Sequence, residues 1–87
     1  MTERMNSNMM RNESVAEEVE QLTVLAKQGQ SDAQERLGNH YFHGDGLEQD
    51  YVQAAIWFRK AAEHGNHKAQ HKLGYLYENG LGVEEDR

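Results

Sequence analysis

Histidine is the residue type in this chain whose chemistry comes closest to that of a catalytic or metal site. His40 and His43 lie three residues apart, and His67 and His71 lie four apart with His64 nearby. Histidines at i and i+4 of a helix can share a metal ion, but the sequence places no carboxylate to orient them. We therefore interpret these side chains as solvated, and we expect no metal and no cofactor.

No other pattern indicates catalysis. The acid pairs Glu17–Glu18 and Glu84–Glu85 are adjacent, and adjacent side chains on a helix diverge rather than converge. The chain has no cysteine, so it has no thiolate nucleophile and no disulfide. Gly44-x-Gly46 is too short for a dinucleotide-binding motif and follows a predicted helix rather than a strand. We expect the chain not to be an enzyme.

Composition restricts the partners. A length of 87 residues allows one small domain, and a net charge of -6 provides no basic stripe for nucleic acid. With 37% hydrophobic residues, the chain has no segment that could span a membrane. The N-terminal stretch also lacks the apolar core of a secretion signal. These features favour a cytoplasmic protein whose partner is a protein or a peptide.

The elements that would position any site follow from a repeat at an offset of 36 residues. Identical residues recur at this offset from the first helix onward: Ala26/Ala62, Gly29/Gly65, Ala33/Ala69, Gln34/Gln70, Leu37/Leu73, Gly38/Gly74, Tyr41/Tyr77, Gly44/Gly80, Gly46/Gly82 and Asp50/Asp86. A period in this range is typical of stacked helix pairs that bury their apolar faces against their neighbours. The repeat predicts an all-α fold, an antiparallel helix-pair solenoid with one full repeat flanked by two half repeats.

Apolar spacing and capping residues predict where the helices lie. We expect a disordered tail over residues 1–12 and a repeat domain over residues 13–87, with helices at about 14–28, 32–43, 50–64 and 67–79. The predicted N-terminal caps are Ser14 with Glu17, Ser31 with Gln34, Asp50 with Gln53, and either Asn66 or His67. Phe58 lies on the alanine stripe of the third helix and Trp57 flanks it, so we interpret both as core residues. Gly38 and Gly74 fall in mid-helix after a repeated leucine, which predicts two helix crossings too close for a methyl group.

The repeated residues resemble the Sel1-like repeat family. The residues that match its pattern are Leu37-Gly38, Tyr41, Gly44, Gly46, Asp50, Ala54, Trp57-Phe58, Ala61-Ala62 and Gly65, and the match resumes at Leu73-Gly74, Tyr77, Gly80, Gly82-Val83 and Asp86. His40 and Leu47 depart from the pattern, and Gln21-Leu22 replace its aromatic pair in the first helix. The resemblance implies a tetratricopeptide-like superhelix and a role in protein–protein interaction.

Residues that the repeat leaves variable are the candidates for partner binding. In stacked helix pairs the first helix of each pair lines the concave surface, so variable residues of the second and fourth helices should face it. Exposed aromatic and arginine side chains are the usual anchors of an interface. The predicted partner-binding residues are Arg36, Asn39, Phe42, His43, Lys72, Tyr75 and Asn79.

Three alternatives to an adaptor remain at this stage. The chain could self-associate into a homo-oligomer through the uncovered face of its last helix. It could be a truncated solenoid without a function of its own, since Asp86 matches the cap Asp50 and the sequence stops where another helix would begin. Some cysteine-rich members of the resembling family are associated with β-lactam binding or hydrolysis, which leaves a hydrolase as the third alternative.

Overall fold

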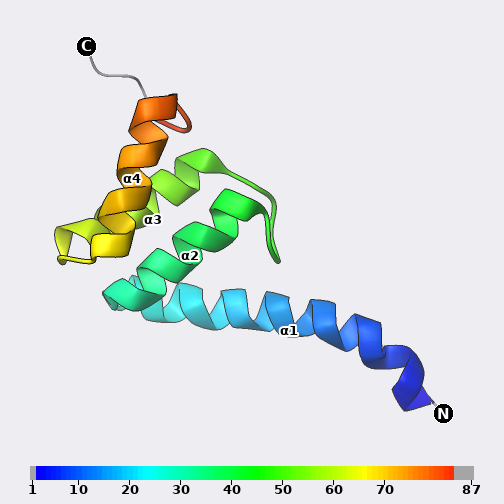
Figure 1. The fold of residues 1–87 in the computed structure, drawn as a ribbon. Helices are drawn as coiled ribbons and strands as arrows, with labels where there is room; N and C mark the ends of the chain where they lie inside the picture. The colour runs from blue at the N-terminus through cyan, green and yellow to red at the C-terminus, as the bar shows by residue number, and fades with distance from the viewer. Residues whose placement is uncertain (1, 84–87) are drawn as a thin grey trace.

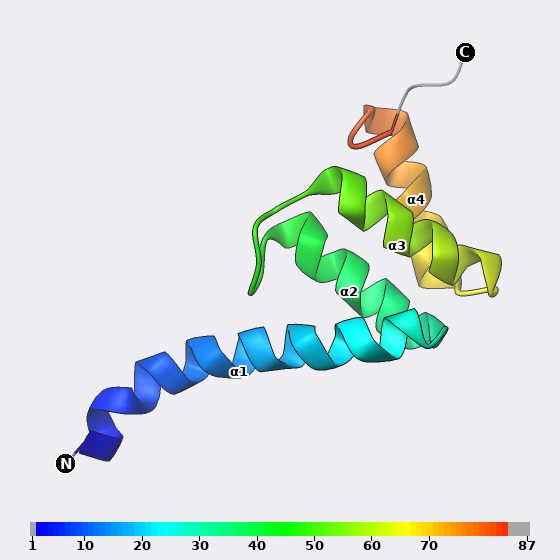
Figure 2. The same cartoon turned by 180° about the vertical axis from the view of Figure 1, so that it is seen from behind.

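Four helices and no strand make up the part of the chain that the computed structural model describes, the backbone of residues 2–83 and the side chains of residues 15–83. They are α1 (Thr2–Lys27), α2 (Ser31–His43), α3 (Tyr51–Glu63) and α4 (His67–Asn79), arranged one after another along the molecule (Figure 1). Each helix packs on the next one in sequence, and the view from behind shows the same order (Figure 2). The all-α solenoid predicted from the repeat is confirmed.

The first helix differs most from its predicted range. α1 begins at Thr2, not at residue 14, so residues 2–12 are helical where the sequence predicted a tail. Ser14 therefore lies inside α1 and does not begin it. No glycine or proline precedes Ser14, so no residue of the strongly helix-breaking types interrupts the chain there.

Of the four predicted caps, Ser14 and Ser31 fail, whereas Asp50 and Asn66 form. Asp50 Oδ1 accepts a hydrogen bond from the backbone N–H of Gln53 at 3.1 Å, and Asn66 Oδ1 accepts one from Ala69 at 2.9 Å. The predicted cap Ser31 is wrong, because α2 begins at Ser31 and its N-cap is Gln30, which makes no side-chain cap bond. Its intended partner Gln34 is buried and makes a different hydrogen bond.

That hydrogen bond is repeated in the second copy. Gln34 Nε2 donates to the carbonyl of Ala26 at 3.0 Å, and Gln70 Nε2 donates to the carbonyl of Ala62 at 3.2 Å. In each copy a glutamine near the start of one helix donates to a carbonyl in the last turn of the preceding helix, which also accepts from the backbone N–H of the glycine that follows that helix. Residues that repeat at the 36-residue offset in the sequence therefore make equivalent hydrogen bonds in the two copies.

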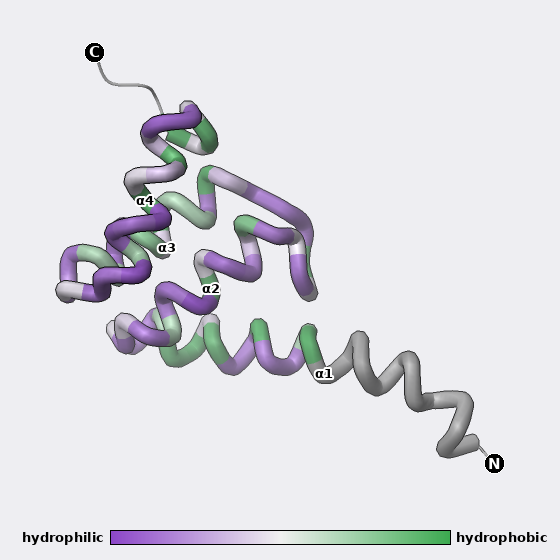
Figure 3. The backbone as a smooth tube through the Cα atoms, viewed as in Figure 1, coloured by the Kyte–Doolittle hydropathy of each residue, from purple (hydrophilic) through white to green (hydrophobic). Residues whose placement is uncertain are grey.

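The core consists of two clusters that follow the helix pairs. The first joins α1 to α2 and contains Val19, Leu22, Ala26, Ala33 and Leu37. The second joins α3 to α4 and contains Ala54, Ala55, Phe58, Ala61, Ala69 and Leu76. Apolar residues of α1 lie on the turns nearest α2 (Figure 3). Phe58 is fully buried, as predicted, and Trp57 is partly buried against the first cluster.

The two mid-helix glycines have different surroundings. A Cβ on Gly38 would lie 2.6 Å from Cε1 of Phe58, so α2 and α3 cross too closely there for a methyl group. A Cβ on Gly74 would meet nothing within 4 Å. The predicted close crossing is confirmed at Gly38 and wrong at Gly74, because among the described residues no helix covers α4 where α3 covers α2.

Candidate functional site

A hollow of about 330 Å³ lies between α2 and α4. We call it the α2–α4 groove, and its lining residues are Asn39, Phe42, His43, His71, Lys72 and Tyr75. On α2, Phe42 and His43 follow Asn39 by three and four positions. On α4, Tyr75 follows Lys72 and His71 by three and four positions. Residues at these spacings share one side of a helix, so each helix presents one face to the groove.

Aromatic rings form the apolar part of the groove. The ring centroids of Phe42 and Tyr75 lie 6.1 Å apart in an edge-to-face arrangement, which joins α2 to α4. Phe42 also packs edge-to-face on Tyr51 at 5.4 Å and on His43 at 4.9 Å. Because 48% of Tyr75 is exposed, its ring offers apolar surface to a ligand.

A hydrogen-bonded network of three polar side chains joins α2 to α4 beside these rings. Lys72 Nζ donates to Asn39 Oδ1 at 2.6 Å, and Asn39 Nδ2 donates to Glu35 Oε2 at 2.8 Å. Lys72 Nζ also lies 3.4 Å from the same Glu35 oxygen. Glu35 is buried, so its carboxylate depends on these two partners, and the network fixes the position of the Lys72 ammonium at the groove.

Replacing Glu35 by alanine is expected to lower the free energy of unfolding by about 1 kcal/mol, because Asn39 and Lys72 lose a hydrogen-bond acceptor. Glu63→Ala, a change of the same type on the exposed surface of α3, is the matched control and is expected to stay within about 0.5 kcal/mol of the wild type. Urea unfolding measures both. Equal values for the two variants would show that the network adds nothing to stability.

Hydrogen bonds from the loop after α2 to carbonyls of the helix hold Phe42 in place. Gln49 Nε2 donates to the carbonyl of Phe42 at 2.9 Å, and the N–H of Asp50 donates to the carbonyl of Tyr41 at 2.9 Å. These bonds satisfy carbonyls of the last turn of α2, which have no partner within the helix. The groove is therefore built on anchored helix ends.

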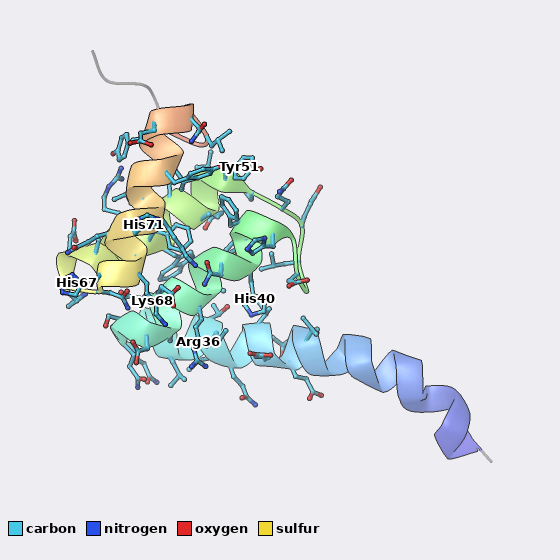
Figure 4. All side chains as sticks on the ribbon, in the orientation of Figure 1. Arg36, His40, Tyr51, His67, Lys68 and His71 are labelled. Carbon is cyan, nitrogen blue, oxygen red and sulfur yellow. The ribbon has the colours of Figure 1, made fainter. Side chains whose placement is uncertain are left out.

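The structure brings together five of the seven predicted partner-binding residues, namely Asn39, Phe42, His43, Lys72 and Tyr75. Arg36 instead lines a neighbouring hollow with His67 and Lys68, near the N-terminal ends of α2 and α4 (Figure 4). Asn79 does not line the groove, and its Nδ2 donates to the carbonyl of Tyr75 at 2.8 Å.

Sequence reasoning missed two residues of the site. His71 lines the groove although we interpreted it only as solvated, and its position four residues before Tyr75 was the available signal. Glu35, the repeat equivalent of His71, is buried, and no signal in the sequence distinguishes it from an exposed glutamate.

The described side chains contain no group of three or more His, Cys, Asp or Glu residues arranged to hold a metal ion. Within residues 2–83, none of the helices combines the length and the apolar character needed to span a lipid bilayer. The residues that line the groove provide aromatic surface, hydrogen-bond donors and one ammonium group.

The chain resembles known proteins in both sequence and fold. The Sel1 repeat matches residues 31–66 and 67–87. The crystal structure of c5321, a protective antigen present in uropathogenic Escherichia coli strains that displays an SLR fold, is similar with a TM-score of 0.79 and 46% identity, over 82% of this chain and 15% of that protein. A Sel1 repeat protein from Oxalobacter formigenes is similar with a TM-score of 0.76 and 38% identity, over 78% of this chain and 28% of that protein.

The chain thus spans less than a third of the length of either solved relative. Comparison with curated proteins finds no match. The family match covers more than half of the chain, in two consecutive units whose boundaries fall at the offset seen in the sequence. The chain belongs to the Sel1 repeat family.

Proposed function

We propose that the chain is a non-enzymatic adaptor that binds a peptide or protein segment in the α2–α4 groove. Sel1 repeats generally mediate protein–protein interaction and are typically non-catalytic scaffolds. We propose the α2–α4 groove as the surface through which this chain binds its protein partner.

One observation carries the proposal. The residues that line the groove are those that differ between the two copies: Asn39 is equivalent to Tyr75, and His43 is equivalent to Asn79. The repeated residues Ala33, Leu37 and Ala69 are buried instead. The groove is therefore lined by side chains that differ between the two copies and that the repeated fold does not require.

The lining indicates which ligand the groove would take. Phe42 and Tyr75 suit an apolar or aromatic side chain inserted edge-on between them. An ammonium group has three hydrogens, and the structure gives Lys72 Nζ two acceptors, Asn39 and Glu35. The third hydrogen suits a carbonyl or carboxylate of the bound segment. The expected ligand is a peptide with an apolar anchor next to a hydrogen-bond acceptor.

Replacing Tyr75 by alanine is expected to weaken peptide binding about tenfold or more, because aromatic anchors dominate the energy of small interfaces. The ligand is a peptide selected from a random display library on the wild-type chain, and isothermal titration gives its Kd for each variant. Arg36→Ala, outside the groove, is expected to have the smaller effect.

Tyr77→Ala is the matched control, since it removes the same side chain two positions along the same helix. Tyr77 lines a different hollow, with Val52 and Ile56 of α3. The proposal predicts that the selected peptide binds Tyr77→Ala with wild-type affinity. Loss of affinity in Tyr77→Ala and not in Tyr75→Ala would move the binding site away from the groove.

A further inference from the structure

A second hollow between α2 and α4 adjoins the α2–α4 groove. It has a volume of about 340 Å³ and lies near the N-terminal ends of both helices (Figure 4). We call it the N-terminal hollow, and its lining residues are Asp32, Glu35, Arg36, Asn66, His67 and Lys68. Glu35 lines this hollow and pairs with Lys72, which lines the groove, so the polar network of the groove joins the two hollows.

The charge of this surface differs from that of the whole chain. The chain carries 15 acidic residues against 9 lysines and arginines, yet no residue that lines the groove is acidic. In the N-terminal hollow Glu35 is buried and paired with Lys72, which leaves Asp32 as the exposed acid. The exposed lining side chains that can carry a positive charge are Arg36, His43, His67, Lys68 and His71. The two hollows therefore form a basic surface on an acidic chain.

Arg36 and Lys68 are the permanent positive charges of the N-terminal hollow. Both side chains are exposed, and neither forms an ion pair with another described side chain. Asp32 lies in the first turn of α2, where the positive end of the helix stabilises an acid. A carboxylate from a partner could pair with both cations, and the arginine fork suits it because two N–H groups can donate to its two oxygens.

The two cations and the two aromatic rings lie at opposite ends of this surface. Arg36 and Lys68 line the N-terminal hollow together, whereas the rings of Phe42 and Tyr75 meet in the groove. Arg36 precedes Phe42 by six residues and Lys68 precedes Tyr75 by seven, which is about 10 Å along a helix that rises about 1.5 Å per residue. An extended peptide rises about 3.3 Å per residue, so about three of its residues span that distance.

We propose that the two hollows together bind an acidic peptide segment of a partner protein. An apolar residue of the segment lies between Phe42 and Tyr75, and an Asp or Glu about three positions away pairs with Arg36 and Lys68. This inference rests on the proposed function, since it names the chemistry of the segment that the groove binds.

The composition of the peptides selected from the random display library is the first test. Among clones that bind the wild-type chain, Asp and Glu are expected to be enriched about three positions from an apolar residue. Lys and Arg are expected to be depleted relative to the unselected library. A selected set without this enrichment would overturn the proposal.

Arg36→Glu combined with Lys68→Glu is the variant that tests the pairing. Repulsion replaces attraction at both sites, so the Kd of the selected peptide is expected to rise at least about tenfold. The matched control is Arg59→Glu combined with Lys60→Glu on α3, which changes the same two residue types and the net charge by the same amount. Neither control residue lines the groove or the N-terminal hollow, so the control is expected to stay within about threefold of the wild-type Kd. Circular dichroism checks that both variants fold.

A charge swap and a salt series measure the same pairing independently. A peptide whose Asp and Glu residues are changed to Lys is expected to bind the Arg36→Glu, Lys68→Glu variant at least about tenfold more tightly than the wild type. In about 1 M NaCl the Debye length falls to about 3 Å, so the difference between the wild type and this variant should largely disappear. The effect of Tyr75→Ala should persist, because the contact it removes is apolar.

The outcomes separate this inference from the proposed function. If Tyr75→Ala weakens binding while the charge reversal leaves the Kd unchanged, groove binding stands and the acidic partner is wrong. If only the charge reversal weakens binding, the acidic partner is supported and the apolar anchor in the groove is contradicted. Saturable binding of a fluorescent single-stranded oligonucleotide that the charge reversal abolishes would overturn the peptide and assign the surface to nucleic acid.

Discussion

Replacing Phe58 by alanine is expected to abolish cooperative folding of the chain. The ring is fully buried, it fills the space at Gly38 of α2, and Lys72 Nζ of α4 lies 5.9 Å from its centroid, so it joins three helices. Truncation of a buried phenylalanine costs about 3–5 kcal/mol. The total stability of a small domain is about 5 kcal/mol at the lower end of the range, so little would remain.

Far-UV circular dichroism with urea unfolding checks this prediction. Phe58→Leu, which keeps most of the apolar volume, is the control and is expected to retain a cooperative transition at lower urea. A Phe58→Ala variant that unfolds within about 1 kcal/mol of the wild type would contradict the role given to this ring, because that loss is typical of an average substitution.

Alanine substitutions at the two equivalent glycines are expected to have different effects on stability. At both positions alanine favours the helix by about 1 kcal/mol over glycine. At Gly38 the new methyl group overlaps the buried Phe58 ring, and overpacking of this kind costs about 1–3 kcal/mol. Gly74→Ala meets no atom within 4 Å. We therefore expect Gly74→Ala to stabilise the chain by up to about 1 kcal/mol and Gly38→Ala to be neutral or destabilising.

Thermal and urea unfolding of the two single variants give this comparison directly, and the double variant tests whether the effects add. Distant sites normally add within about 0.5 kcal/mol. If both variants are equally stabilised, the Phe58 side chain moves at little cost to make room for a methyl group at Gly38. If both variants are equally destabilised, α4 is covered in solution by something that the described residues do not include.

The sequence predicts well what the repeat itself determines. Leu37 and Phe58 are core residues because their positions relative to the repeated alanines put them on the buried face of a helix. The caps Asp50 and Asn66 follow from local chemistry, since each hydrogen bond spans only three residues. In the groove, spacing along each helix was enough to bring Phe42 and Tyr75 onto facing surfaces.

The features that the sequence could not predict depend on contacts between distant residues. Glu35 is buried because Lys72, 37 positions away, reaches it across the helix pair. Gly38 and Gly74 have the same local sequence signal, and only the presence of α3 over one of them makes their surroundings differ. Arg36 shares a helix face with Asn39 but lies one turn earlier, which places it in a separate hollow.

Groove binding is tested most directly by mapping backbone amide chemical shifts while the selected peptide is added to the wild-type chain. The largest changes are expected at the groove residues Asn39, Phe42, His43, Lys72 and Tyr75, with α1 unaffected. Changes centred on Gly74 and Tyr77, or on α1, while the groove amides stay unchanged would contradict the proposed function.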